Sequence, residues 1–295
     1  MKNIQKLQYL KAYIKYINYI ILFLFLFLIN FNTAKCINLS SPINPAKIDK
    51  DRYIGIFFGL GQNIQDGIKL VTCDSCFFSN GLKFGYDIGI LYEQQFTNNL
   101  SSFIYKFNWG IKAFYSDLGV NANFIENKYE YFDNYNMSIP FSLQHLNTIS
   151  ISNVGIMPFV KYNCFDFLFF SLGVNFNYFL NDFMEHKIKL LEKTKTLPNG
   201  EVVSISIPGK KDNISEYVVE NGDIIGINKF YLSLMPAIGF DFNLSEKIKL
   251  STIFNYSTPL TDILNDYEDN FLINTWRLAV ELKYNFANKN NIYRK

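Results

Sequence analysis

The sequence predicts an all-β protein, an eight-stranded antiparallel up-and-down transmembrane β-barrel with long outer loops and short periplasmic turns. Apolar and polar residues alternate with a period of two over eight segments, and short and long connections alternate between those segments. Successive side chains of a strand point to opposite faces, so this period indicates strands. A strand that spans lipid needs one apolar face toward the acyl chains and one polar face toward a closed interior.

Composition supports the same class. Of the 295 residues, 18% are aromatic and only 18% are charged, whereas an average globular protein has roughly 25% charged residues. Aromatic rings are favoured where a barrel meets the membrane interface. No change in composition divides the part after residue 36 into two domains.

Residues 1–36 have the pattern of a secretory signal peptide. Four lysines precede the apolar stretch at 20–29, and Ala34-Lys35-Cys36 offers small residues at the cleavage position, so we expect cleavage after Cys36. The apolar stretch is short for a spanning helix. We expect 37–51 to form a periplasmic lead segment, 52–286 the outer-membrane barrel and 287–295 a short C-terminal tail.

The net charge changes once this segment is set aside. The whole chain carries +2, but residues 1–36 contain five lysines and no acid, which leaves 23 basic against 26 acidic residues. The basic character therefore belongs to the targeting segment, and binding to nucleic acid is not predicted.

Eight segments carry the strand pattern. In the clearest, Phe84, Tyr86 and Ile88 alternate with Gly85 and Asp87. Most of the segments reach the roughly ten residues that a tilted membrane strand requires. The predicted strands are 53–62, 81–96, 100–115, 149–162, 167–180, 230–242, 247–256 and 275–286.

The connections alternate in length. Those at 97–99, 163–166 and 243–246 are short and polar, and those at 63–80, 116–148, 181–229 and 257–274 are long. Outer-membrane barrels have short periplasmic turns and long outer loops. In the third long loop, Asn199-Gly200 predicts a hairpin that extends the barrel wall as a β-ribbon. A similar ribbon is predicted in the second long loop, around 128–132.

Aromatic residues gather at the predicted strand ends, where they would form girdles at the membrane interfaces. These interfacial aromatics are Tyr92, Trp109, Tyr115, Tyr162, Tyr178, Tyr256, Trp276, Tyr284 and Phe286, with Phe96 and Tyr105 beside them.

Charged residues lie on the inward faces of the predicted strands. They could line an ion path, but eight strands leave an interior that side chains can fill, and buried charges need partners of opposite sign. We therefore expect pairs inside the barrel rather than a wide pore. These lumen charges are Lys83, Asp87, Glu93, Lys106, Lys112, Lys161, Asp241, Lys249, Arg277, Glu281 and Lys283.

Cysteines and histidines are the remaining candidates for chemistry. Cys73-x-x-Cys76 lies in the first long loop and is expected to be a disulfide, because the compartment is oxidising and no second pair exists to complete a zinc site. Cys164 is expected to be unpaired. No catalytic residue, cofactor or metal is predicted.

The two histidines are the basis of an alternative interpretation, in which the protein is an enzyme. His145 and His186 are the only ones, and His186 has Asp182, Glu185 and Ser204 near it in sequence. Eight-stranded barrels include enzymes such as the lipid A palmitoyltransferases, but a triad is recognised by geometry. Histidines of a solvated loop are the preferred interpretation.

These features resemble the outer-membrane β-barrel domain family of the small OmpA/OmpX-like type, as found in the Bacteroidota and Chlorobi. The resemblance covers about 52–286, and the C-terminal pattern Tyr284-x-Phe286 fits the strand that such barrels present to the assembly machinery. Family members often continue into a peptidoglycan-binding domain, which is not expected here because the chain stops nine residues after Phe286. The matching residues are Cys73, Cys76, Phe77, Gly81, Gly85, Gly89, Tyr92, Glu93, Gly155 and Pro158.

The expected function is that of a non-enzymatic, integral outer-membrane protein with a structural or surface-interaction role. Its expected partners are outer-membrane lipid, the barrel-assembly machinery and an extracellular ligand reached through the loops. A narrow porin or transporter for small solutes is the alternative, and a lipid-modifying enzyme is the third.

Overall fold

The computed structural model describes residues 51–287, except 68, 71–76, 79, 97–105, 133–136, 198, 209, 211–213 and 265–270. No helix in this described part is long and apolar enough to cross a membrane. Eight long strands form the barrel. They are β1 (Arg52–Gly67), β4 (Leu82–Gln95), β5 (Phe107–Asp117), β7 (Met137–Asn163), β8 (Leu168–Leu190), β12 (Phe230–Asn243), β13 (Ile248–Pro259) and β14 (Phe271–Asn285).

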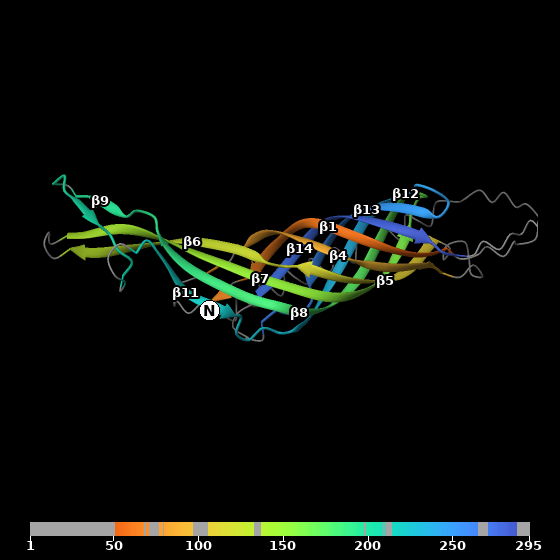
Figure 1. Ribbon diagram of the computed structural model, residues 1–295, viewed down its shortest axis with the longest axis horizontal. Helices are drawn as coiled ribbons and strands as arrows, with labels where there is room; N and C mark the ends of the chain where they lie inside the picture. The colour runs from red at the N-terminus through yellow and green to blue at the C-terminus, as the bar shows by residue number, and fades with distance from the viewer. Residues whose placement is uncertain are drawn as a thin grey trace, which may run out of the picture. The chain divides into compact units, whose positions relative to one another are not determined.

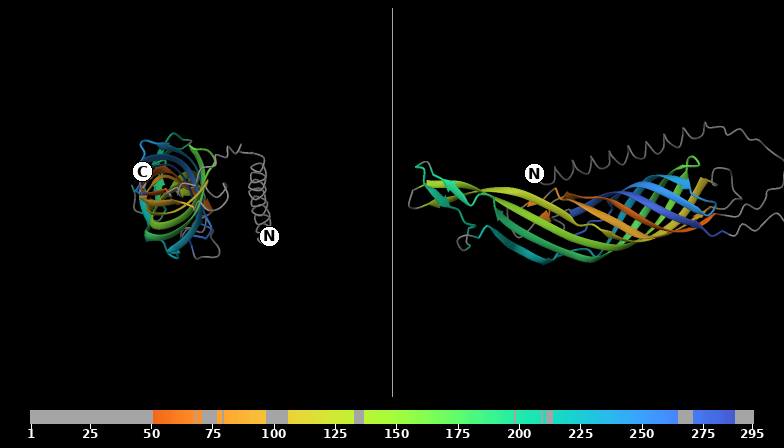
Figure 2. Two further views of the ribbon diagram at one scale, coloured as in Figure 1. Left: turned by 90° about the vertical axis from the view of Figure 1, so that its right-hand side faces the viewer. Right: turned by 45° about the horizontal axis from the view of Figure 1, so that its top comes forward.

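The eight strands close into a ring. Each pairs antiparallel with the barrel strand before and after it in sequence, and β1 pairs with β14 from Tyr53↔Asn285 to Gly67↔Phe271. The end-on view of Figure 2 shows the resulting barrel. Closure leaves no unpaired edge within the barrel wall. The predicted fold class and strand number are confirmed.

Short turns join the strands at one end of the barrel, which we call the turn end; the opposite end is the loop end. Residues 164–167 connect β7 to β8, and 244–247 connect β12 to β13. In the second turn, the backbone N–H of Leu244 donates to the carbonyl of Ile248 at 2.9 Å. The connection predicted at 97–99, and the predicted beginning of the third strand at 100–105, lie outside the described residues.

Two strands are much longer than predicted. β7 begins at Met137 instead of 149, and β8 continues to Leu190 instead of ending at 180. Beyond the barrel, β6 (Val120–Phe132) pairs with β7 and β11 (Glu216–Asp223) pairs with β8, forming the sheet that projects from the loop end in Figure 1. We call this sheet, residues 120–132, 137–151, 182–190 and 216–223, the ribbon.

The ribbon has its own small core, which explains why its sequence lacks the pattern of a lipid-facing strand. Phe141 and Leu143 of β7 are buried with Leu190 of β8 and with Ile205 and Ile207 of the loop that follows. The apolar face is therefore covered by protein. The predicted hairpin around Asn199-Gly200 is also present, as β9 (Thr194–Thr196) paired with β10 (Val202–Ser204).

Glycines on the barrel's inner face make room for aromatic rings. A Cβ added to Gly89 would lie 2.8 Å from Cε1 of Phe57, and one added to Gly155 would lie 2.6 Å from Cζ of Phe114. Both contacts are shorter than ordinary van der Waals separation. A ring on one strand thus covers a glycine on the neighbouring strand.

We expect Gly89→Ala to destabilise the barrel by about 1–3 kcal/mol, because the methyl group would meet the backbone carbonyl of Ala113 and overpack the space under Phe57. Gly222 of β11 is the matched control, since a Cβ there meets nothing within 4 Å. Urea unfolding of the two alanine variants in lipid vesicles measures the difference. Equal stability of the two variants would contradict this packing.

Candidate functional site

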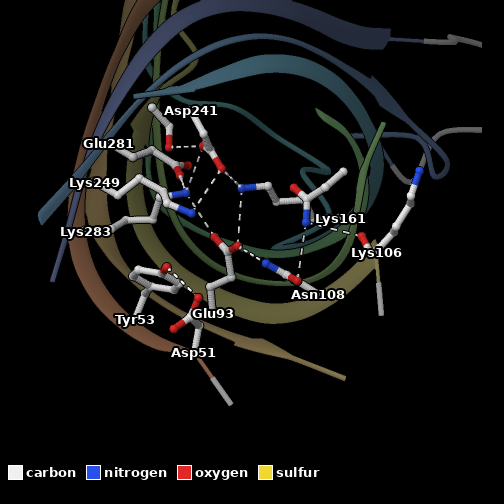
Figure 3. A network of polar contacts seen from close by, with 12 residues as sticks. Asp51, Tyr53, Glu93, Lys106, Asn108, Lys161, Asp241, Lys249, Glu281 and Lys283 are labelled. Atoms are coloured by element: carbon white, nitrogen blue, oxygen red, sulfur yellow. Dashed lines mark hydrogen bonds and ion pairs between the residues drawn. The ribbon is translucent and has the colours of Figure 1, made fainter. Parts of the chain in front are cut away.

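The inner face at the turn end carries a network of ion pairs (Figure 3). Lys283 of β14 lies 3.0 Å from Glu93 of β4 and 3.5 Å from both Asp241 and Glu281. Lys161 of β7 lies 2.6 Å from Asp241 and 3.3 Å from Glu93. These charges satisfy one another across the barrel, as a network of buried charges must.

Further contacts extend this network. Lys112 of β5 pairs with Glu281 at 2.5 Å, and Asn108 donates to Glu93. The Lys161 amine lies 3.9 Å from the ring centre of Phe169, a cation–π distance. We call Glu93, Lys112, Lys161, Asp241, Glu281 and Lys283 the ionic layer; each is at most 8% exposed.

The other predicted lumen charges take different positions. Lys249 approaches Asp241 at 3.7 Å and lies over Tyr53, at the margin of the ionic layer. Lys83 and Lys106 form no ion pair with a described residue. Lys106 lies at the turn end, and its side chain points away from the network in Figure 3.

Arg277 forms a second charged level closer to the loop end. Its guanidinium is fully buried, donates to Asp87 at 3.3 Å and to Asn63 at 2.6 Å, and also donates to backbone carbonyls of Gln62 and Asp117. A guanidinium carries five N–H donors in a fixed planar arrangement, so it can donate to several acceptors at once.

A small polar cavity of about 30 Å³ lies in the interior at this level. Asn153, Asn175, Asn177 and Asn255 line it, and each has one buried amide atom without a hydrogen-bond partner. A polar cavity of this size has room for a water molecule.

Apolar side chains fill the interior at the loop end. Phe179 stacks on Tyr231 with ring centres 4.8 Å apart, and Ile149 and Ile263 are fully buried in the same cluster. Ile227 and Leu264 form an isolated β-bridge that brings two long connections together there. The interior thus contains an ionic layer, a small polar cavity and an apolar layer in sequence along the barrel.

The predicted interfacial aromatics lie on the outer face. At the turn end, Tyr92 contacts Trp109 at 5.7 Å and Phe286 at 6.3 Å, measured between ring centres. Nearer the loop end, Tyr178 lies 4.8 Å from Phe230. Tyr115, Tyr162, Tyr256, Trp276 and Tyr284 are also partly or largely exposed on this face. Tyr105 lies outside the described residues.

Among the cysteine predictions, the structure tests only the one for Cys164. Cys73 and Cys76 lie outside the described residues. Cys164 is a free, buried thiol in the turn between β7 and β8. The described part of the chain holds no group of three His, Cys, Asp or Glu side chains arranged around a metal position.

The prediction that the two histidines are solvated loop residues is wrong, because both lie inside the ribbon. His145 and His186 are 1% and 0% exposed, and Nδ1 of His145 lies 3.1 Å from Nε2 of His186. Desolvation, together with a smaller contribution from His145, lowers the pKa of His186 to about 4. Desolvation also lowers the pKa of His145, against the raising effect of Glu126. The prediction failed because the pairing of β7 with β8 in the ribbon was not visible in the sequence.

The acid and hydroxyl groups near His186 in sequence have other surroundings. Asp182 pairs with Lys229 at 2.8 Å, and Glu185 pairs with Lys187 at 2.8 Å. Ser204 is exposed on β10. The structure does not bring these groups together as a triad with His186.

No protein-family model and no curated protein matches the chain. Among solved structures, the chain is similar to Ail, the attachment invasion locus protein of Yersinia pestis, at 14% identity over 79% of this chain and 99% of that one, with a TM-score of 0.28. It is also similar to Neisserial surface protein A at 7% identity over 79% and 97%, with a TM-score of 0.33. A third is the outer membrane protease OmpT of Escherichia coli, at 11% identity over 83% and 100%, with a TM-score of 0.28. At these scores, the barrel architecture rests on the strand pairing described above.

Proposed function

We propose that this chain is an integral outer-membrane barrel of the small OmpA/OmpX-like type, with a filled interior and a non-enzymatic, surface-interaction role. The main supporting observation is that the outer face of the barrel is apolar and its interior is charged, which is the reverse of a water-soluble protein. Ile56, Phe84 and Leu278 on the outer face are 60%, 69% and 61% exposed, whereas Lys283 and Arg277 inside are 1% and 0% exposed. Lipid solvates such an outer face, and water does not.

The targeting features support the same location. The proposed signal peptide ends at Cys36, and the proposed periplasmic lead runs from 37 to 51. Both ends of the barrel sequence lie at the turn end, where the N–H of Phe286 donates to the carbonyl of Arg52. This is the arrangement expected of a barrel with periplasmic termini, delivered to the outer membrane by assembly machinery that reads the terminal strand.

The ribbon is the proposed interaction surface. One edge of β6 pairs with β7, and among the described residues the other edge pairs only at Asn121, with Leu82. Ile125, Tyr129 and Tyr131 on this strand are 57%, 72% and 57% exposed. An open strand edge with exposed apolar side chains is suited to binding another protein.

The filled interior predicts that the protein does not conduct ions. Purified protein in a planar bilayer should give no steady single-channel steps, because the ionic and apolar layers obstruct the path. A planar bilayer exposed to the detergent buffer alone is the control for leakage. Reproducible steps would contradict this proposal and favour the narrow porin.

Orientation of the ribbon is tested with an inserted epitope. A peptide epitope placed between Asn199 and Gly200 should bind its antibody on intact cells, because the proposal puts the loop end outside. The matched insertion between Ser245 and Glu246, in a short turn, should bind only after permeabilisation. The reverse pattern would overturn the proposed topology.

A further inference from the structure

The ribbon has two outer strands, β6 and β11, and their outer edges differ. In β11, a bulge between Val218 and Glu220 interrupts the register with β8, and the eight residues of the strand carry three acidic side chains and no basic one. Bulges and charges of one sign are features that keep a strand edge from pairing with another chain. β6 pairs with β7 without a register shift over its whole length and carries both signs of charge. Of the two edges, that of β6 is therefore the one suited to adding a strand.

The sequence of β6 is self-complementary in one antiparallel register. When Asn127 lies opposite the same residue of a second copy, Glu126 lies opposite the partner's Lys128 and Ile125 lies opposite the partner's Tyr129. Opposite charges, and an aromatic ring beside a β-branched side chain, stabilise such directly opposed positions. Two-fold symmetry makes each of these contacts twice. A slip of two residues in either direction places lysine opposite lysine or Glu126 opposite glutamate, which is destabilising.

The side chains that this register uses are accessible on β6. Ile125 and Tyr129 are 57% and 72% exposed on one face of the strand, with Asn127 exposed between them. On the other face, Lys128 is partly exposed and lies 3.1 Å from Glu126 of its own chain. In the paired form, each Glu126 carboxylate would lie between two lysines.

The direction of β6 determines how two paired copies are oriented. The strand runs from the base of the ribbon, where Val120 pairs with Ile149, to its tip, where Phe132 pairs with Met137 (Figure 1). Antiparallel pairing lays the tip of one β6 beside the base of the other, so the two barrels point their loop ends at each other. Barrels inserted in one membrane all point the same way. This pairing therefore joins copies in two facing membranes.

We propose that the edge of β6 binds β6 of a second copy of this chain in a facing outer membrane, so that the protein holds cells together by pairing with itself. The inference rests on the proposed function, which places the loop end outside the cell. The pairing uses about 20 Å of strand, from Phe124 to Glu130. One such contact is small for a stable complex, but many contacts between two surfaces bind cooperatively through multivalency.

A cysteine cross-link in detergent tests the register. In the full chain with its four native cysteines replaced by serine, Asn127→Cys should give a disulfide-linked dimer on mild oxidation, because opposed Cα atoms are about 4.5–5.5 Å apart. Ser142→Cys is the matched control: Ser142 of β7 lies opposite Asn127, and both variants lose the same hydrogen bond. The two copies of Ser142 would be about 14 Å apart, three strand spacings, and should not cross-link. No dimer of Asn127→Cys, or equal yields from both variants, would overturn the proposal.

An exchange of charges separates pairing from misfolding. Lys128→Glu and Glu126→Lys should each weaken self-association about tenfold, because each places like charges opposite one another. An equal mixture of the two variants should recover association, since every acid then faces a lysine of the other variant. Sedimentation in detergent measures this, and circular dichroism checks that both variants are folded. A folded mixture that does not recover would overturn the proposal, since a general loss of stability is not repaired by mixing.

Pairing between cells is tested with two populations in a host whose lipopolysaccharide is truncated. One population carries Ile125→Cys and the other Tyr129→Cys, with different tags, on the background that lacks native cysteines. Oxidation of the mixed cells should link one chain from each population. Cells with Ile125→Cys alone should give no dimer, because the two copies of Ile125 are about 13 Å apart along the strands.

The epitope between Asn199 and Gly200 distinguishes the two ways in which the cell experiment can fail. Populations that both display the epitope but form no link would overturn pairing between cells and leave the proposed location intact. An epitope hidden on intact cells would overturn the proposed location, and the adhesive role with it, whatever the result in detergent.

Discussion

Replacing Lys283 by Met is expected to destabilise the folded barrel by about 3–5 kcal/mol, the usual cost of removing one partner from a buried ion network. The Lys283 side chain is fully buried and contacts Glu93, Asp241 and Glu281. Its removal leaves these carboxylates close together, with Lys112, Lys161 and Lys249 as the remaining cations. Methionine has a similar length, so lost packing contributes little.

Urea unfolding in lipid vesicles, followed by the fluorescence of the two tryptophans, measures this effect. Lys247→Met is the matched control, because Lys247 is exposed in the short turn at the same end of the barrel. We expect the control to lie within about 0.5 kcal/mol of the unaltered chain. A similarly small effect of Lys283→Met would show that the ionic layer is hydrated and that the interior is open.

The second large effect is expected on the outer face. Ile88→Arg should cost about 2–4 kcal/mol, the cost of a basic side chain at the bilayer midplane of a barrel. Ile88 is 50% exposed at the middle of the outer face of β4, opposite Phe58 of β1 in the register. On a water-exposed surface, the same change would be nearly neutral.

Leu244→Arg provides the comparison for this variant. Leu244 is 61% exposed, more than Ile88, but lies in a short turn beyond the apolar face. We expect its substitution to change the free energy of unfolding by less than about 1 kcal/mol. Equal effects at the two positions would contradict a lipid-facing surface on β4.

The barrel itself could be predicted from sequence because each of its strands carries a local signal. In β14, Leu278, Val280 and Leu282 are exposed, whereas Arg277 and Glu281 are buried, as the alternation required. The inward direction of a side chain follows from the period of two alone.

The partners of the lumen charges could not be predicted in the same way. Lys112 of β5 pairs with Glu281 of β14, 169 residues away, although β1 and β4 lie between these strands in the wall. Such contacts cross the interior and depend on the stagger of the whole ring. The alternation predicts that a side chain points into the barrel, but it does not determine the position of that side chain along the barrel axis.

The β6–β7 part of the ribbon, around 128–132, was predicted, but the β7–β8 pairing that buries the histidines was missed for a related reason. His145 of β7 and His186 of β8 are buried by the pairing of these two strands, with Phe124 stacked on His145 and Phe78 edge-on to His186. Their burial depends on a register between segments 41 residues apart. No local pattern encodes that register.

The most direct test of the membrane proposal is flotation of residues 37–295 after refolding with phospholipid vesicles. The barrel should float with the lipid in a density gradient, keep its β-sheet circular dichroism and resist extraction at high salt and high pH. A folded, monodisperse β-sheet protein in buffer without detergent or lipid would contradict the proposal that acyl chains solvate the outer face.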